Sequence, residues 1–354
     1  MTISWLVCLL ALPGGASGEV PTSLSAFVAQ PTLDEGDKSE IREYTAFYLD
    51  LLARGDHDDV MKARTKLVEP MQNVRRRASS AFRSAYAAGL IPSLETILDE
   101  GDVYRGVNAI QIAGFLGTDS SIRMLGQRAS SLDEPDYTKR LWVAIAIRES
   151  MTNGELSLRS FNAAVRALAD AAESEDDWRV LMRQLESVSS IARSRRSQDE
   201  GGEDLRSIGR TLQLRMIRST LDRILSGQGG VELILALRPS IFDVQQQYLD
   251  PELIRYRREV GLNMAPQLAR VYDVILLHHE SLQGNEKLKY SSGLSLRLSD
   301  ETLRLIDGDY ANAQRDLPYP NLNLENPWLN NKDDLRKAKE AWDVMHSKPP
   351  YTGR

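Results

Sequence analysis

Apolar residues recur along this chain at intervals of three and four residues, which is the pattern of amphipathic helices. The first such run predicts a helix that begins at a capping box formed by Asp37 and Glu40 and ends at Gly55. Its apolar positions follow a 3-4-3 spacing and are Ile41, Tyr44, Tyr48 and Leu51. Because the same pattern continues through most of the chain, the sequence predicts an all-α protein.

Proline and glycine punctuate the segments that follow, and they predict short helices. We expect one helix over residues 60–68 that ends near Pro70. Another is expected over residues 78–89, stopping at Pro92. Residues 94–98 should then form a separate short helix.

A near-repeat lies in this helical region. The segment 98–102, Leu-Asp-Glu-Gly-Asp, recurs 34 residues later as Leu-Asp-Glu-Pro-Asp at 132–136. An apolar helical stretch follows each copy, at 103–116 and at 141–147. Residues 141–147 are apolar at every position and could form a buried strand, but their register with the first copy favours a helix. Such self-similarity is typical of stacked helical hairpins, whose units bury their apolar faces on their neighbours.

The first copy resembles a known repeat family. Residues 103–110, Val-Tyr-Arg-Gly-Val-Asn-Ala-Ile, with Phe-Leu-Gly-Thr-Asp at 115–119, are similar to the second helix of a HEAT-type repeat. In the second copy, Lys139 and Arg140 stand near the arginine position. The resemblance covers about residues 80–195 and implies an α-solenoid of HEAT-like or armadillo-type hairpins, a fold that commonly binds other proteins. The period also suits tetratricopeptide repeats, but their Trp/Leu-Gly/Tyr signature is missing from the first helices.

The helical pattern continues on both sides of a polar break. Residues 158–172 and 178–188 carry apolar residues at helical spacing and predict a third hairpin. Residues 196–204 contain no apolar residue and predict a linker. We therefore expect a HEAT-like repeat region at 37–195 and a second helical region at 205–308.

Prolines divide the second region as well. Pro239 and Pro251 are expected to end helices, and Pro266 to occupy the first position of one. Leu-Ser-Leu-Arg-Leu at 294–298 alternates as a strand would, but helix or irregular chain is favoured because no partner strand is evident. The remaining residues, 309–354, are expected to form an extended tail with a charged helix from about Lys332 to His346.

The N-terminus differs from the rest of the chain. Residues 3–12 are almost entirely apolar, a Pro-Gly-Gly break follows, and Ala-Ser-Gly at 16–18 offers the pattern that signal peptidases accept. We therefore expect a cleaved signal peptide at 1–18, a polar leader at 19–36, and export to a bacterial periplasm or the extracellular space. Cys8 is the single cysteine, so the mature chain would form no disulfide. No transmembrane segment is expected after cleavage, since a membrane helix needs about 20 apolar residues.

Composition and motifs argue against several function classes. Acidic residues outnumber basic ones by 50 to 44, and the net charge of −6 argues against a general nucleic-acid binder. The chain has no P-loop, dinucleotide fingerprint, Gly-x-Ser-x-Gly elbow, His-Glu-x-x-His motif or EF-hand loop. Neither a catalytic site nor a cofactor is therefore indicated.

Histidines form one cluster, His278-His279-Glu280. Helical spacing places His278 on an apolar stripe, which favours a hydrogen-bonded core histidine. A metal ion would need a second ligand one turn away, where Val274 cannot serve, so no metal site is expected. If the protein is instead an α-helical enzyme, such as a polysaccharide lyase or hydrolase, its site is expected around His278, His279 and Tyr272.

Basic residues supply the candidate binding surfaces, because guanidinium and ammonium groups grip carboxylates and phosphates. One surface belongs to the repeat region and the other, with an adjacent tyrosine, to the second region. The residues expected to contact a partner are Arg105, Lys139 and Arg140 in the first and Arg255, Tyr256, Arg257 and Arg258 in the second.

These observations favour an exported, non-catalytic helical-repeat scaffold that binds a protein or peptide. One alternative is an envelope structural protein that binds acidic glycans or lipid headgroups, and the other is the α-helical enzyme. The two binding hypotheses differ in salt dependence, because salt screens charge-driven binding but leaves an apolar protein interface largely intact.

Overall fold

The computed structural model describes residues 23–72, 78–192, 205–251, 254–310 and 331–351. Within these ranges the chain forms α-helices joined by turns, with one short 3-10 helix and no strand, so the all-α prediction is confirmed. The expected signal peptide, the expected linker at 196–204 and residues 311–330 and 352–354 of the expected tail lie outside the described residues. None of the described helices is long and apolar enough to cross a membrane.

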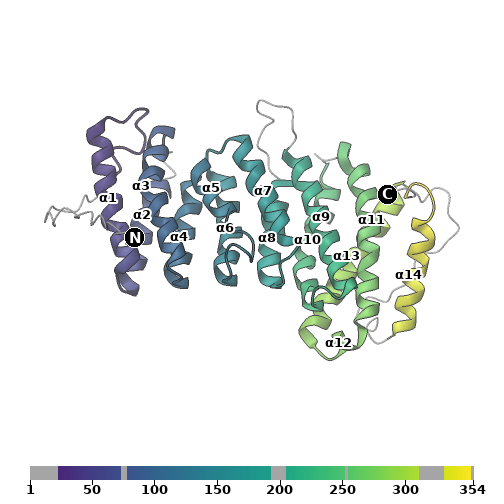
Figure 1. Ribbon diagram of the computed structural model, residues 1–354. Coiled ribbons are helices and arrows are strands. Elements are labelled where there is room, and N and C mark those ends of the chain that lie inside the picture. The colour runs from purple at the N-terminus through teal and green to yellow at the C-terminus, as the bar shows by residue number, and fades with distance from the viewer. Residues whose placement is uncertain (1–22, 73–77, 193–204, 252–253, 311–330, 352–354) are drawn as a thin grey trace, which may run out of the picture.

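The helices stand side by side in a row, from α1 at one end to α14 at the other (Figure 1). The first eight are α1 (Glu35–Arg54), α2 (His57–Gln72), α3 (Ser80–Asp99), α4 (Val103–Leu116), α5 (Asp119–Gly126), α6 (Tyr137–Asn153), α7 (Leu158–Ala172) and α8 (Trp178–Ala192). The others are α9 (Leu205–Ser226), η1 (Val231–Leu233), α10 (Ile234–Leu249), α11 (Ile254–Leu277), α12 (His279–Gln283), α13 (Glu286–Tyr310) and α14 (Lys332–His346).

Contacts between helices define two layers. In layer A, each helix packs on the next in the series α1, α3, α5, α7, α9 and α11. In layer B, the same holds for α2, α4, α6, α8, α10 and α13. Each layer A helix also packs on a layer B helix that follows it in sequence, and α14 packs on α11 at the end of the row.

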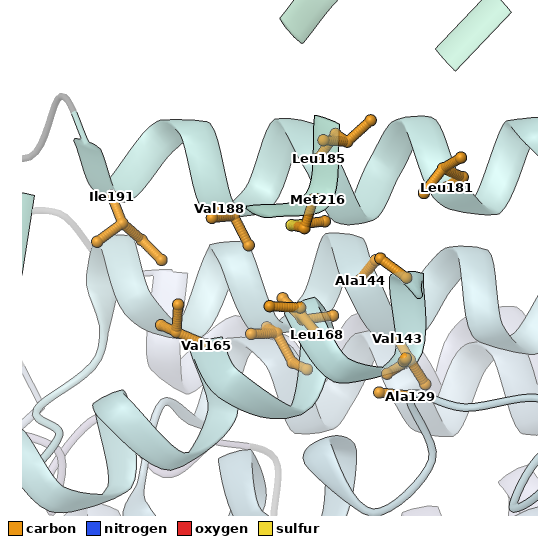
Figure 2. Close-up of a cluster of buried hydrophobic side chains, with 14 of the residues drawn as sticks. Ala129, Val143, Ala144, Val165, Leu168, Leu181, Leu185, Val188, Ile191 and Met216 are labelled. Carbon is orange, nitrogen blue, oxygen red and sulfur yellow. The ribbon is translucent and has the colours of Figure 1, made fainter. Parts of the chain in front are cut away.

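The apolar core lies between the layers and continues from Leu24 to Tyr351. Figure 2 shows part of it, where Val165 and Leu168 of α7 lie opposite Leu185 and Val188 of α8. Beyond the predicted linker, α9 packs against both α7 and α8. The core is therefore shared by helices on either side of the stretch predicted to separate two regions.

Within layer B, α4 and α6 approach so closely at Gly114 that no larger residue fits there. A Cβ atom on Gly114 of α4 would lie 2.9 Å from the Cβ of Ala146 in α6 and 3.0 Å from its Cα. In the same interface, the Ser150 hydroxyl donates to the Gly114 carbonyl oxygen at 2.9 Å. The close contact of the two backbones leaves little room for substitution at Gly114.

The start of α1 differs from the prediction. Asp34 is the N-cap, and it forms the capping box with Asp37, so the box predicted from Asp37 and Glu40 is wrong. The described end of the predicted polar leader packs at the start of α3, because Val28 is buried and its carbonyl oxygen accepts from the N–H of Ser79, the N-cap of α3, at 2.8 Å.

Several prolines lie inside helices, although they were expected to end a helix or, at Pro266, to begin one. Pro70 lies in α2, Pro92 in α3, Pro239 in α10 and Pro266 in α11, so the short helices predicted around them are wrong. Pro92 is exposed, and so is Ala88, whose carbonyl loses its helical partner and can bond water instead. The expectation at Pro251 holds, because α10 ends at Leu249.

The remaining local predictions agree with the structure. Residues 141–147 lie in α6 and residues 294–298 in α13, so helix is confirmed for both. The charged helix predicted from Lys332 to His346 is α14. Gly117 ends α4 with φ of 55°, a left-handed conformation that glycine adopts without strain.

Candidate functional site

Lys139 and Arg140, predicted to contact a partner, are buried at the start of α6. The Lys139 side chain is 3% exposed, and its Nζ donates to the Leu98 carbonyl oxygen at 3.1 Å. The Arg140 guanidinium is 6% exposed and donates to both carboxylate oxygens of Glu175, at 2.8 and 2.9 Å. A partner could reach these cations only if the bonds within the chain opened.

Arg105 is half-buried and is also engaged within the chain. Its guanidinium donates to Asp102 Oδ2 at 2.6 Å and to the Gly55 carbonyl oxygen at 2.9 Å. Arg105 and Lys139 lie near each other, because Lys139 Cε would be 2.7 Å from a Cβ on Gly106. The structure thus brings the predicted residues of the repeat region together, where they connect successive hairpins.

The second predicted patch lies at the start of α11. Arg257 is half-buried, its Nε donates to the Tyr248 carbonyl oxygen at 2.7 Å, and its guanidinium lies 5.1 Å from the Tyr248 ring centre. Arg258 is exposed. The side chains of Arg255 and Tyr256 lie outside the description.

Tyr272 is buried, whereas His278 and His279 are half-buried. Tyr272 is fully buried, and its hydroxyl donates to Asp300 Oδ1 at 2.7 Å. His278 is half-buried between α11 and α12, so the expectation of a core histidine is met only in part, although its Nε2 lies 3.4 Å from the Ile224 carbonyl oxygen. In the described part of the chain, no group of three or more His, Cys, Asp or Glu residues is placed to hold a metal ion.

A feature not predicted from the sequence lies where the layer B helices begin. Four of these helices carry an aromatic side chain in their first two residues, and we call this set the aromatic edge. It consists of His57 in α2, Tyr104 in α4, Tyr137 in α6 and Trp178 in α8.

Each member of the aromatic edge follows an aspartate that caps its helix. Asp56 accepts from the Asp59 N–H at 3.0 Å and Asp102 from the Arg105 N–H at 2.9 Å. The other two caps follow the same plan, with Asp136 accepting from Thr138 and Asp177 from Arg179, both at 2.8 Å. An aspartate followed within two residues by an aromatic side chain is therefore the signal that could have located this edge.

Ring contacts connect the aromatic edge across neighbouring helices. His57 and Tyr104 are stacked, with ring centres 4.5 Å apart and an angle of 15° between the planes. The Arg179 guanidinium lies 4.2 Å from the centre of the Tyr137 ring. Lys287 Nζ, from α13, lies 4.5 Å from the Trp178 ring centre. The rings therefore follow the row of helices from α2 to α8, with cations already lying over two of them.

Exposed apolar side chains add to the aromatic edge. Tyr137 is 43% exposed, Val103 is 37% exposed, and Leu132, in the turn before α6, is 92% exposed. Met61 lies one turn after His57 and is 36% exposed. His57 is exposed as well, whereas Tyr104 and Trp178 are half-buried and pack against the core. Exposed aromatic and aliphatic side chains close together are typical of a surface that binds another molecule.

The turns before the aromatic edge are acidic, and several of their carboxylates are occupied by the chain's own cations. Four ion pairs are formed there, Arg105 with Asp102, Arg128 with Asp99, Arg179 with Asp177 and Arg223 with Asp176. Arg223 also donates to the Glu175 carbonyl oxygen at 2.8 Å. Asp56, Asp58 and Glu100 are exposed, and no ion pair with a described residue holds them. The edge thus keeps a surplus of negative charge.

Two of the capping carboxylates are kept ionised by their surroundings. The backbone N–H of Arg105, together with its guanidinium, lowers the pKa of Asp102 below the usual 3.8. The Arg179 guanidinium and backbone N–H lower the pKa of Asp177 in the same way. Both aspartates therefore carry a full negative charge at neutral pH.

The sequence was compared with models of known protein families and with curated proteins, and it matches none of them. The function proposed below therefore stands on the arrangement of this chain's own residues.

Proposed function

We propose that this protein is a helical-repeat scaffold that binds a protein or peptide partner along the aromatic edge, and that it has no catalytic activity. The observation that carries the proposal is the row of His57, Tyr104, Tyr137 and Trp178 at successive helix starts. Tyrosine and tryptophan dominate the binding energy of protein interfaces, because they bury a large area with few rotatable bonds.

The arrangement of the helices supports the scaffold part of the proposal. We infer an α-solenoid of HEAT-like hairpins, since each hairpin packs mainly on the hairpins before and after it. An array of this kind offers a long surface on which a partner can contact several units at once. The apolar residues 3–12, followed by a small-residue site, support the further proposal that the protein is exported.

An affinity purification tests the proposal. The full chain, tagged at its C-terminus and expressed in its own cells, is recovered at low and at high salt, and the bound molecules are identified by mass spectrometry. We expect a stoichiometric protein that is retained at high salt, because apolar contacts are not screened. Recovery of glycan or lipid alone, lost as salt rises, would overturn the proposal.

Two variants locate the interaction. Tyr137→Ala combined with Leu132→Ser removes one exposed ring of the aromatic edge and the exposed leucine beside it, and is expected to release the partner. Tyr290→Ala in α13, where the side chain is 67% exposed, is the matched control and should retain it. If both variants retain the partner equally, binding lies elsewhere on the chain. Circular dichroism serves to check that both variants remain helical.

A further inference from the structure

A groove lies between two helices of layer A, α5 and α7. Its volume is about 620 Å³. The floor is formed by small or aliphatic residues, namely Ile122, Gly126, Ala163, Ala164 and Ala167. A Cβ on Gly126 would be 3.8 Å from the Ala167 Cβ, so no long side chain of the protein fills the space at this point.

Two arginines line this groove, one from each wall. Arg123 projects from α5 and Arg159 from α7, and both are exposed. Neither guanidinium forms an ion pair with a residue in the described part of the chain, although Arg123 attracts the Asp119 carboxylate. Asp119, the carboxylate in the lining, accepts from the Ser157 N–H at the start of α7 at 2.9 Å. The lining therefore carries a net positive charge on a protein whose net charge is −6.

The groove between α1 and α3 makes a useful comparison. It also has an alanine-rich floor, in two adjoining parts of about 570 and 540 Å³. Two of its three cations are paired, Lys38 with Glu35 at 2.7 Å and Arg54 with Asp50 at 2.9 Å. Arg42 forms no ion pair with a described residue, although it attracts the Glu35 carboxylate. The groove between α5 and α7 thus offers more unpaired positive charge.

We propose that the groove between α5 and α7 binds an acidic peptide segment of a partner. Aliphatic side chains of the segment occupy the floor over Gly126 and Ala163, and its Asp or Glu carboxylates pair with Arg123 and Arg159. Guanidinium groups bind carboxylates through two parallel hydrogen bonds, which fixes the position of the segment as well as its affinity. No aromatic residue lines the groove, so its floor suits aliphatic side chains better than sugar rings, which stack on aromatic faces.

This site is independent of the aromatic edge, because the two share no residue and differ in the sign of their charge. If both are occupied, the protein holds two partners of different composition at once. The row of helices then fixes the distance between them, which is a property of scaffolds that bring proteins together.

A selection with a phage-displayed library of linear peptides tests the site. The probe is the full chain, and the selected peptides are synthesised and titrated by fluorescence anisotropy. We expect sequences in which Asp and Glu alternate with aliphatic residues. Arg123→Glu combined with Arg159→Glu should weaken their binding by at least about tenfold, since both carboxylate contacts become repulsive.

Three further variants separate the groove from other surfaces. Ala163→Trp fills the floor from an exposed position and should also weaken binding by about tenfold or more. Arg166→Glu changes an exposed charge of α7 outside the lining and should leave the affinity unchanged. Tyr137→Ala should likewise leave it unchanged, so failure of this site and failure of the aromatic edge are distinguishable.

The proposal is overturned if no peptide is selected, if the selected peptides show no excess of Asp and Glu, or if the double arginine variant binds them as tightly as the wild-type chain does. Equal losses in Arg166→Glu and in the double variant would also overturn it, because they would show attraction to the overall field of the protein rather than to the groove.

Discussion

The guanidinium of Arg140 in α6 and the carboxylate of Glu175 before α8 form a buried pair joined by two hydrogen bonds, at 2.8 and 2.9 Å. Removal of Glu175 leaves the buried Arg140 charge with only the Glu134 and Pro135 carbonyl oxygens as acceptors. Glu175→Ala is expected to lower the free energy of unfolding by about 3–5 kcal/mol, as measured by urea denaturation.

A double variant separates the cost of the lone charge from the value of the pair. Arg140→Met combined with Glu175→Met removes both charges, and its loss of stability should be well below that of Glu175→Ala. Arg336→Ala breaks an exposed pair with Asp333 and should cost no more than about 1 kcal/mol. A double variant less stable than Glu175→Ala would contradict this account.

The capping aspartates should make stability depend on pH. The pKa values of Asp102 and Asp177 in the folded chain lie below the usual 3.8 of the unfolded chain. Their ionised forms therefore stabilise the fold above about pH 4, and this contribution is lost as the pH falls through the folded pKa values.

Asparagine at the same two positions still caps a helix but carries no charge. Asp102→Asn combined with Asp177→Asn is expected to be less stable than wild type at pH 7, and the difference should shrink steadily in acid. Urea denaturation over a series of pH values measures this difference in the free energy of unfolding. Asp58→Asn, which changes an exposed residue, is the control. A difference that stays constant with pH would show that charge is not the cause.

Two glycines of layer B differ in the space around them, and we expect their substitution by alanine to have opposite effects on stability. Gly114→Ala places a Cβ 2.9 Å from the Ala146 Cβ and 3.0 Å from its Cα, so α4 and α6 must separate, at a cost of about 1–3 kcal/mol. Gly308→Ala in α13 meets nothing within 4 Å and should add up to about 1 kcal/mol through helix propensity. Thermal unfolding followed by circular dichroism compares the two.

Asp300 is expected to hold the last helix in place. Its side chain is fully buried and accepts from the Tyr272 hydroxyl at 2.7 Å and from Trp342 Nε1 of α14 at 3.1 Å. Asp300→Ala removes the acceptor of both donors and of Arg304, whose Nε donates to Asp300 Oδ2 at 2.6 Å. A buried group that loses its hydrogen bond costs about 1–3 kcal/mol. Hydrogen exchange should then increase in residues 332–346 more than in α4. A uniform increase along the chain would instead indicate global destabilisation.

Local signals in the sequence were sufficient for much of the fold. Register with the first copy of the repeat identified the helix around 141–147, and the charged helix at 332–346 was also predicted correctly. The repeated acidic segment ended at two residues, Asp102 and Asp136, that do cap helices. These features depend on interactions between residues a few positions apart. The first capping box was placed three residues too late, because Asp34 and Asp37 satisfy the same pattern as Asp37 and Glu40.

Features that depend on contacts with neighbouring hairpins could not be predicted from the sequence. Pro92 was expected to end a helix, yet packing on both sides of α3 outweighs its local preference, and its exposed position allows water to satisfy the freed carbonyl. Lys139 and Arg140 were expected at the surface, as basic residues usually are. Their burial follows from acceptors supplied by other turns, the Leu98 carbonyl and Glu175.

The cations that connect the hairpins often end on backbone rather than on side chains: Arg105 reaches the Gly55 carbonyl, Lys139 the Leu98 carbonyl and Arg223 the Glu175 carbonyl. Every amino acid has a backbone carbonyl, so the residue that accepts the hydrogen bond can be replaced as long as the local backbone conformation is unchanged. The length of the Arg or Lys side chain must stay the same, because it sets the spacing between one hairpin and the next.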